Sequence, residues 1–193
     1  EEYGVFRMIV LTTTKRTDER LLERMENHYS KPKGFVGRNI CYAVSVGDEY
    51  FGHIVAGSAT RFLPGRHAYL GTEDHQLNNI VNNIFFNVAP VSEKYPFRNF
   101  TAKVVKAFVS QVTNDWLIKY GDQVVGFETL VELPRQGVLY KKAGWVEVGL
   151  TKGCTCKRVG GQGTDSWTGK RVWDTENLKP KKVLCLKNTG YFG

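Results

Sequence analysis

The side chains best suited to moving protons begin at the end of a predicted helix, at His28-Tyr29-Ser30. The helix-breaking sequence Lys31-Pro32-Lys33-Gly34 follows at once, which places His28 at a rim of the fold. An imidazole there can serve as a base or as a metal ligand near neutral pH. The helix macrodipole alone also favours a terminal histidine, so the sequence leaves both interpretations open.

Two glutamates, Glu128 and Glu132, lie four residues apart on a predicted strand and therefore face the same side. If that side lines a cleft, Glu132 at the end of the strand is the better general base or metal ligand. If that side faces solvent, both carboxylates pair with surface lysines and contribute little.

An asparagine cluster, Asn82, Asn83 and Asn87, lies on another predicted central strand, where asparagine is depleted. Buried amides need hydrogen-bond partners, so these side chains favour a polar cleft over a dry core.

A candidate anion site opens a long amphipathic helix that runs to about Tyr120. Its residues are Arg98, Asn99, Phe100, Thr101 and Ala102. Asn99 is the predicted N-cap, and Gly121 is the predicted stop. Unpaired N–H groups converge at a helix N-terminus, so this segment, with an arginine beside it, predicts binding of an anionic group.

These residues require an α/β domain in which most strands share one mixed sheet. The expected strands are residues 5–12, 40–46, 50–58, 68–70, 80–88, 123–133, 145–150 and 182–186. The expected helices are residues 15–28, 98–120 and 137–143, and residues 151–171 are predicted to form a loop or a flexible arm. The apolar positions expected to face inward include Leu21, Leu22 and Met25 in the first helix and Ile80, Ile84, Phe86 and Val88 in one strand.

The chain of 193 residues is long enough for one domain with a full hydrophobic core, here residues 1–150, plus an extension, residues 151–193. We expect the extension to pack on the domain or to extend it. It carries nine lysines and arginines against three acidic residues, a net +6 of the chain's +8. Such charge suits a phosphate backbone, and a solvated basic surface without a partner explains it as well.

The cysteine pattern and the hydrophobic runs predict the compartment. The four cysteines do not have the spacing of an ordinary zinc site, which indicates a reducing compartment and, on the cysteines alone, no metal. Since no apolar run is long enough to span a bilayer and no signal-peptide pattern opens the chain, we expect a cytoplasmic protein without a membrane partner.

The predicted order of elements resembles the GNAT acyltransferase superfamily. In that fold two central strands splay, and the pyrophosphate of an acyl-CoA lies over the loop after the fourth strand. Here those strands are residues 80–88 and 123–133, and Arg98–Ala102 stands in place of the usual Gln/Arg-x-x-Gly-x-Gly/Ala loop. The segment Leu139–Trp145 is similar to the tyrosine-then-Gly-aromatic segment of many GNAT enzymes, which implies that Tyr140 is a general acid toward the leaving group. The residue alone is equally typical of a half-buried core tyrosine whose hydroxyl finds a hydrogen-bond partner.

A second resemblance is to the Mom family of phage proteins, which are GNAT-like and add a carbamoylmethyl group to the exocyclic amine of adenine in DNA. It rests on His28-Tyr29-Ser30, on Asn82-Asn83, and on Glu132 followed by Gly137, Tyr140, Ala143 and Trp145. Residues 81–145 also resemble a domain of Druantia anti-phage defence. The likeness covers about residues 25–152, with Glu132 where those families more often have aspartate and Gly144 where asparagine is usual.

The Mom-like resemblance implies a transferase that modifies adenine in double-stranded phage DNA, in the host cytoplasm, and protects that DNA from restriction. The implied catalytic residues are His28, Tyr29, Glu132 and Tyr140. Asn83 and Asn87 would contact an extruded base, and the backbone contacts would come from Lys157, Arg158, Lys170 and Arg171.

The implied donor is an acyl-CoA or a related acyl or aminoacyl compound bound at Arg98–Ala102, with any need for a metal left open. Two alternative functions remain. One is a nucleic-acid-binding module of an anti-phage defence system, and the other is an ordinary GNAT N-acetyltransferase.

Overall fold

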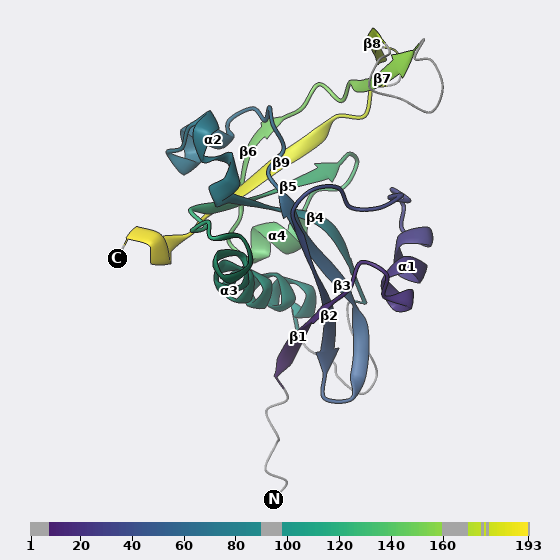
Figure 1. The fold of residues 1–193 in the computed structure, drawn as a ribbon, viewed down its shortest axis with the longest axis vertical. Helices are drawn as coiled ribbons and strands as arrows, with labels where there is room; N and C mark the ends of the chain where they lie inside the picture. Colours follow the sequence, from purple (N-terminus) through teal and green to yellow (C-terminus); the bar gives the residue numbers. More distant parts are fainter. Residues whose placement is uncertain (1–7, 90–97, 160–169, 175, 177, 193) are drawn as a thin grey trace, which may run out of the picture.

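The computed structural model describes residues 8–89, 98–159, 170–174, 176 and 178–192 (Figure 1). Its strands are β1 (Ile9–Thr14), β2 (Asn39–Val46), β3 (Glu49–Ser58), β4 (Ile80–Val88), β5 (Gly126–Glu132), β6 (Val146–Leu150), β7 (Thr155–Val159), β8 (Lys170–Asp174) and β9 (Lys181–Lys187). Its helices are α1 (Glu19–Glu26), α2 (Arg66–Leu70), α3 (Phe100–Tyr120) and α4 (Val138–Lys142), with short 3-10 turns at Asp74–Asn79 and Thr189–Phe192. None of these described helices is long and apolar enough to cross a membrane.

Seven of the described strands form one mixed sheet in the order β1-β2-β3-β4-β5-β9-β6, which confirms the predicted α/β class. β4 and β5 are parallel, and every other neighbouring pair is antiparallel. β9 lies between β5 and β6, so the C-terminal extension returns to the sheet after the separate β7–β8 hairpin. Figure 1 shows that hairpin standing away from the sheet, at the end opposite the N-terminus.

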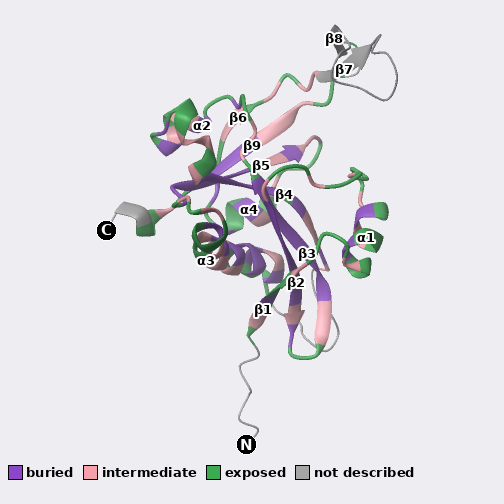
Figure 2. Ribbon diagram, in the orientation of Figure 1, coloured by how far each residue is buried: buried purple, intermediate pink, exposed green. Residues whose placement is uncertain are grey.

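Alternate residues of the central strands pack on opposite faces of the sheet, as a period of two requires. Tyr42 and Ile54 belong to the core beneath α3, while their neighbours Cys41 and Val55 pack against α1. α3 and α4 therefore cover one face, and α1 and α2 lie on the other. Figure 2 shows the buried residues along the strands and along the inner side of α3.

The parallel strands β4 and β5 separate after a short pairing. They are in register from Ile80 opposite Gly126 to Asn82 opposite Glu128, and beyond that point β5 continues only with β9, up to Glu132. At the point of separation the Thr129 hydroxyl donates to the Asn83 carbonyl at 3.0 Å, replacing the next hydrogen bond of the ladder. The strands then diverge around a gap.

A β-bulge at Ile84 reverses the side-chain alternation along β4. Asn83 pairs with Ala56 and Phe85 with Val55, which leaves Ile84 without a partner on β3. The predicted inward face, which contained Ile84, is wrong for this reason: the Ile84 side chain is 37% exposed, while Phe85 is buried.

Three further predictions differ from the structure. Residues 68–70 lie in helix α2, which begins after Gly65 at φ +74° and ends before Gly71 at φ +71°. Left-handed glycines on both sides delimit one helical turn there and outweigh the local strand pattern. Leu22 is exposed because the buried side of α1 carries Leu21 and Met25, one helical turn apart, and Leu22 lies beside that side. Within the predicted arm, residues 155–159 form strand β7.

Candidate active site

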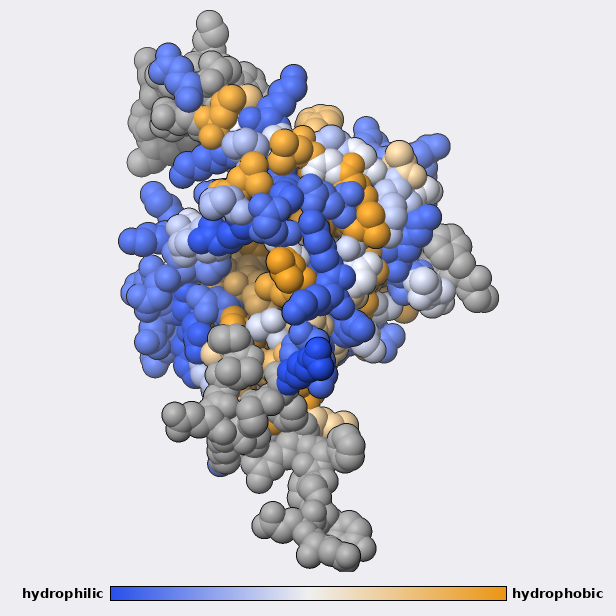
Figure 3. All heavy atoms as spheres, turned by 180° about the vertical axis from the view of Figure 1, so that it is seen from behind, coloured by the Kyte–Doolittle hydropathy of each residue, from blue (hydrophilic) through white to orange (hydrophobic). Residues whose placement is uncertain are grey.

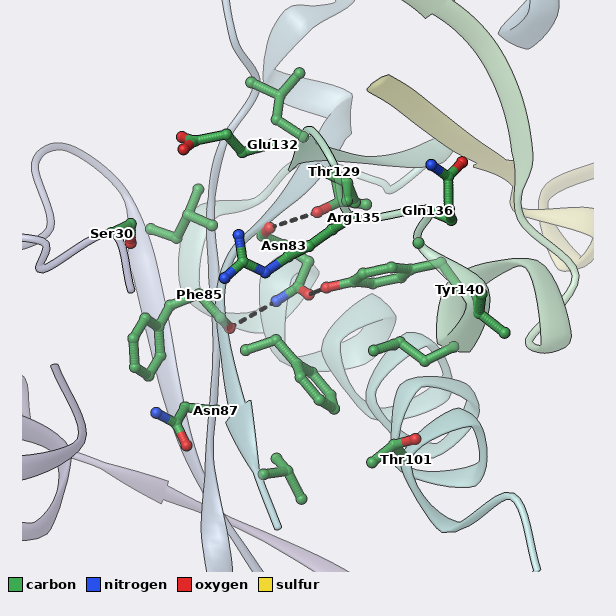
Figure 4. A pocket seen from close by; sticks show the side chains of 18 of the residues that line it. Ser30, Asn83, Phe85, Asn87, Thr101, Thr129, Glu132, Arg135, Gln136 and Tyr140 are labelled. Carbon is green, nitrogen blue, oxygen red and sulfur yellow. Dashed lines mark hydrogen bonds between the residues drawn. The ribbon is translucent and has the colours of Figure 1, made fainter. Parts of the chain in front are cut away.

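A cavity of about 1040 Å³ lies where β4 and β5 separate. Thr101 and Tyr140 line it from the face that carries α3 and α4, and His28 and Ser30 line it from the connection between α1 and β2 on the other face. Figure 4 shows this arrangement, with Ser30 and Thr101 on opposite sides of the gap and Asn83 between them. The cavity therefore connects the two faces of the sheet at the splay.

The four residues predicted to be catalytic all line this cavity: His28, Tyr29, Glu132 and Tyr140. His28 contacts Phe85, which packs on the face of the sheet that carries α1. Glu132 lies on this same face, because it is four residues from Glu128 along β5, and Glu128 pairs with Arg66 of α2. Tyr140 approaches from α4, on the other face. His28 and Glu132 thus lie on one side of the gap, opposite Tyr140. Their catalytic roles remain predictions.

Tyr140 is buried and its hydroxyl donates to Oδ1 of Asn83 at 2.5 Å. The orientation of that amide is fixed, because its Nδ2 donates to the carbonyls of Val55 at 3.0 Å and Phe85 at 2.9 Å. Desolvation raises the pKa of the Tyr140 phenol far above its ordinary value. The phenol is therefore protonated at neutral pH, and its proton is directed toward Oδ1 of Asn83.

His28 is held as a neutral base. Its Nδ1 lies 2.8 Å from the Ser30 hydroxyl and accepts from the Ser30 N–H at 3.3 Å, so the Ser30 hydroxyl is the donor of the pair. Burial lowers the pKa of the imidazole, the nearby positive charge of Arg135 lowers it further, and a hydrogen bond to the backbone of Phe86 opposes the shift. The neutral form therefore predominates at physiological pH.

The two glutamates have different environments. Glu132 lines the cavity and its carboxylate lies 3.9 Å from the ammonium of Lys181. Glu128 is fully buried, and its carboxylate accepts from the Thr60 N–H at 2.6 Å and from Arg66 at 2.9 Å. Burial raises the pKa of Glu128, and its hydrogen bonds oppose that rise. Glu128 is therefore a structural residue at the start of the splay.

The predicted base-binding amides of Asn83 and Asn87 both line the cavity, but protein groups already occupy them. Asn87 accepts from the Arg24 guanidinium at 3.1 Å and donates to the Arg24 carbonyl at 3.3 Å, which attaches β4 to α1. Asn83 is occupied by Tyr140 and two carbonyls. Satisfied buried amides position their neighbours. The role of Asn83 and Asn87 in contacting an extruded base remains a prediction.

The predicted anion site lies at the N-terminus of α3 as expected, but the cation beside it is not Arg98. Asn99, Phe100, Thr101 and Ala102 line the cavity at the N-terminus of α3, whereas Arg98 is exposed and is not among the lining residues. Asn99 precedes the helix at φ +57° and makes no side-chain cap; its Oδ1 instead accepts from Lys142 at 3.0 Å. Lys142 therefore supplies the positive charge beside this helix end.

Two lining residues were missed from the sequence. Ser30 was noted only as part of a motif, although a hydroxyl two residues after a candidate base lies within reach of its ring. Arg135 lines the cavity from the loop after β5, and its guanidinium carbon lies 3.4 Å from the centroid of the Tyr29 ring. The available signal for it was a charged residue in the loop three positions after the polar strand end at Glu132.

The remaining predicted residues give no geometry for a site. The backbone of Lys157, Arg158, Lys170 and Arg171 lies in the β7–β8 hairpin, and their side chains lie outside the described part of the structure. Within the described residues there is no cluster of three or more histidine, cysteine, aspartate or glutamate side chains that could hold a metal ion. Figure 3 shows that the surface is largely hydrophilic on the reverse side, with apolar residues in scattered patches and in a recess near the centre.

Comparison with known proteins identifies the fold. The sequence matches no protein-family model and no curated protein. A GNAT family acetyltransferase from Elizabethkingia anophelis, with acetyl-CoA bound, is similar in structure at 12% identity, with a TM-score of 0.53 over 93% of this chain and 97% of that one. The aminoglycoside acetyltransferase AAC(6')-Ib, in complex with coenzyme A and kanamycin, gives a TM-score of 0.56 at 13% identity over 96% and 98% of the two chains. The chain therefore has the fold of the GNAT acetyltransferases.

Proposed function

We propose that this protein transfers an acyl group from an acyl-CoA to an amine acceptor. The observation that supports this most strongly is the cavity at the splay of β4 and β5, which is lined from both faces of the sheet. Acyl transfer needs donor and acceptor on the two sides of one carbonyl, held within reacting distance. Solved structures of the same fold contain acetyl-CoA or coenzyme A, so acetyl-CoA is the first donor to test.

The donor fits on the α3 side of the gap. Beyond Asn83 one edge of β4 pairs with β3, and its other edge faces the gap. Exposed strand edges bind extended ligands through backbone hydrogen bonds, which suits the two amides of the pantetheine arm. The pyrophosphate would then meet the N–H groups that begin α3, with Lys142 beside them.

The proton-handling groups lie on both sides of such a thioester. The amine attacks the carbonyl carbon and loses a proton, which passes to the Ser30–His28 pair on the α1 side. The carbon–sulfur bond breaks, and the thiolate takes the proton of Tyr140 from the α4 side. The acceptor loses one proton and the thiol gains one, so the step balances.

Release of coenzyme A tests the proposed function. The purified protein should bind acetyl-CoA and release free thiol when a panel of primary amines is added, and the acylated amine should appear by mass spectrometry. If acetyl-CoA does not bind at millimolar concentration, the donor assignment is wrong.

A second candidate acceptor is the exocyclic amine of adenine in DNA, and the charge of residues 151–193 favours it. A net +6 on this extension suits phosphates, and the β7–β8 hairpin that carries four of its cations stands apart from the sheet (Figure 1). A base leaving the stack would enter the α1 side of the cavity while the hairpin held the flanking backbone.

A matched pair of charge variants tests the DNA proposal. The first variant changes four hairpin cations to glutamine: Lys157, Arg158, Lys170 and Arg171. The control changes four exposed cations elsewhere: Lys15, Lys33, Arg61 and Lys106. For each phosphate that the hairpin no longer neutralises, the log–log salt slope of duplex binding should fall by about 0.9. Equal slopes in the two variants would contradict the hairpin's role, and unmodified adenosine after incubation with DNA and donor would contradict adenine as the acceptor.

A further inference from the structure

Arg135 stacks on Tyr29 on the α1 side of the cavity, opposite the α3 side proposed for the donor. Arg135 follows the cis Leu133–Pro134 bond after β5, and Tyr29 follows His28 in the connection after α1. The guanidinium carbon lies 3.4 Å from the ring centroid, a separation that requires the guanidinium to lie flat on the ring. Figure 4 shows the Arg135 side chain extending into the cavity, between Glu132 and Asn83.

Within the described part of the chain, the hydrogen-bonding capacity of this guanidinium is unused. None of the described carboxylates lies within 4.0 Å of it, and none of the hydrogen bonds of the described residues uses its side-chain donors. The nearest acidic neighbour in sequence, Glu132, faces Lys181 instead at 3.9 Å. A guanidinium that lies on an aromatic face keeps its N–H groups in its own plane, where they are directed outward and match the two oxygens of an oxyanion.

The charged residues that line the cavity also favour an anionic ligand at Arg135. Its cations are Arg135, Lys142 and Lys181, and its only carboxylate among the described residues is Glu132. Lys142 lies at the donor's helix end, where it bonds Asn99, and Lys181 lies opposite Glu132. Arg135 is therefore the positive charge that remains for a second ligand, and it is positioned beside the Ser30–His28 pair.

We infer that Arg135, stacked on Tyr29, binds an oxyanion of the acceptor, so that the site selects amines that carry a carboxylate or a phosphate. The identification of the bound molecule as the acyl acceptor rests on the proposed acyl transfer. The oxyanion site itself does not depend on that proposal. A bound oxyanion would place the amine of such a molecule near Ser30 and, through it, His28. A bidentate guanidinium–oxyanion pair is planar, so it would also fix the orientation of the bound molecule.

Small aromatic ligands that differ only in charge test the inference directly, without acyl transfer. The probes are benzoate and phenyl phosphate, with benzamide as the neutral isostere, titrated in a phosphate-free buffer of low ionic strength. Binding is measured by calorimetry and by the 15N–1H signal of the Arg135 Nε–H. At least one anion should bind about 10- to 100-fold more tightly than benzamide and shift that signal. The two anions show whether carboxylate or phosphate is preferred.

Three variants separate a specific pair from general charge. Arg135→Gln should reduce the preference for anions to less than about threefold, and Arg135→Lys should retain only part of it because an ammonium lacks the planar fork. Arg61→Gln removes the same charge and another arginine–aromatic contact, 5.7 Å from Phe62, at a residue outside the cavity lining, and should bind as the wild type does. Arg135 is exposed on a loop, so its replacement should leave the fold intact.

Two outcomes would overturn the inference: the wild type binds neither anion better than benzamide, or the preference survives Arg135→Gln. A separate titration with acetyl-CoA keeps the two proposals distinguishable. Anion binding without acetyl-CoA binding would refute only the donor, and the converse would refute only the oxyanion site.

Discussion

The hydroxyl of Tyr140, on α4, donates a hydrogen bond to the side chain of Asn83, on β4. Since the Asn83 amide nitrogen is held by two carbonyls of the sheet, the amide cannot turn to donate to the phenol. The pair therefore fixes a protonated phenol at the point where β4 and β5 separate, which is where the proposed leaving thiolate forms.

Replacing Tyr140 with phenylalanine should lower kcat about 10²- to 10⁴-fold, the range for a general acid. The ring contacts with Phe86 and Trp145 remain, so acetyl-CoA binding should change little. Stability should fall by about 1 kcal/mol, because the buried Asn83 Oδ1 loses its donor. The matched control is Tyr42→Phe, which removes another buried phenol, bonded to Asp115 at 2.8 Å on the far side of the core. That control should lower stability by about 1 kcal/mol and leave kcat unchanged. Equal kcat values for wild type and Tyr140→Phe would exclude the general-acid role.

The pH profile of kcat/KM should report His28. Because burial and the charge of Arg135 lower its pKa, the neutral base persists below pH 6.5, and activity should fall only as pH drops below the ordinary histidine range. His28→Gln should remove this acid limb and lower the rate at neutral pH. Arg135→Gln should shift the acid limb to higher pH, because removing a nearby positive charge raises the pKa of His28. An acid limb that persists in His28→Gln would assign it to another group.

Stability should fall in acid because His53 is buried without charge. It is 0% exposed, its Nδ1 lies 2.6 Å from the Tyr50 hydroxyl, and burial lowers its pKa to about 4. Below pH 6.5 the unfolded chain binds a proton that the folded chain does not, so the free energy of unfolding should decrease as pH falls from 6.5 to 4, by roughly 3 kcal/mol in all. Above pH 6.5 this contribution is complete and constant.

Urea denaturation between pH 7.5 and 4 measures this effect. His53→Gln should flatten most of the slope, with a smaller remainder from His28, whose pKa is also lowered. The control His75→Gln, at an exposed position, should keep the slope. A steep slope retained in His53→Gln would show that other groups cause the acid sensitivity.

Replacing only one partner of the Arg66–Glu128 ion pair should lower the free energy of unfolding strongly. Both side chains are 0% exposed, so Arg66→Met leaves a buried carboxylate without its cation and should destabilise the protein by about 3–5 kcal/mol. Adding Glu128→Gln should restore part of that loss, since a neutral amide can still accept from the Thr60 N–H. The midpoints of urea denaturation for the two variants give the comparison. A double variant less stable than Arg66→Met would contradict it.

The sequence predicted most elements because their signals are local. β4 was predicted with its observed bounds, Ile80–Val88, from its apolar positions and the Pro-bounded loop that follows. The bulge at Ile84 could not be predicted, since it depends on pairing with β3, where Gly57 leaves room for the Ile84 side chain. The inward face of β4 was therefore wrong although its bounds were right.

The site was predictable where chemistry is tied to element ends and unpredictable where it depends on partners. His28 and Glu132 were identified because each ends an element, and both line the cavity. The amides of Asn83 and Asn87 were expected to face a ligand, but their protein partners lie on β3, α1 and α4, which only the tertiary structure brings together. Arg135 was missed because its significance comes from Tyr29, far away in sequence.

The most direct test of the account is calorimetric titration of acetyl-CoA into the wild type and into Thr101→Trp, which fills the donor end of the cavity at the start of α3. The control is Lys106→Trp, at an exposed position of the same helix outside the cavity lining. The wild type and Lys106→Trp should each bind one acetyl-CoA per chain, and Thr101→Trp should bind it at least tenfold more weakly. Equal affinity in all three proteins, or no binding by the wild type, would contradict a donor site at the splay of β4 and β5.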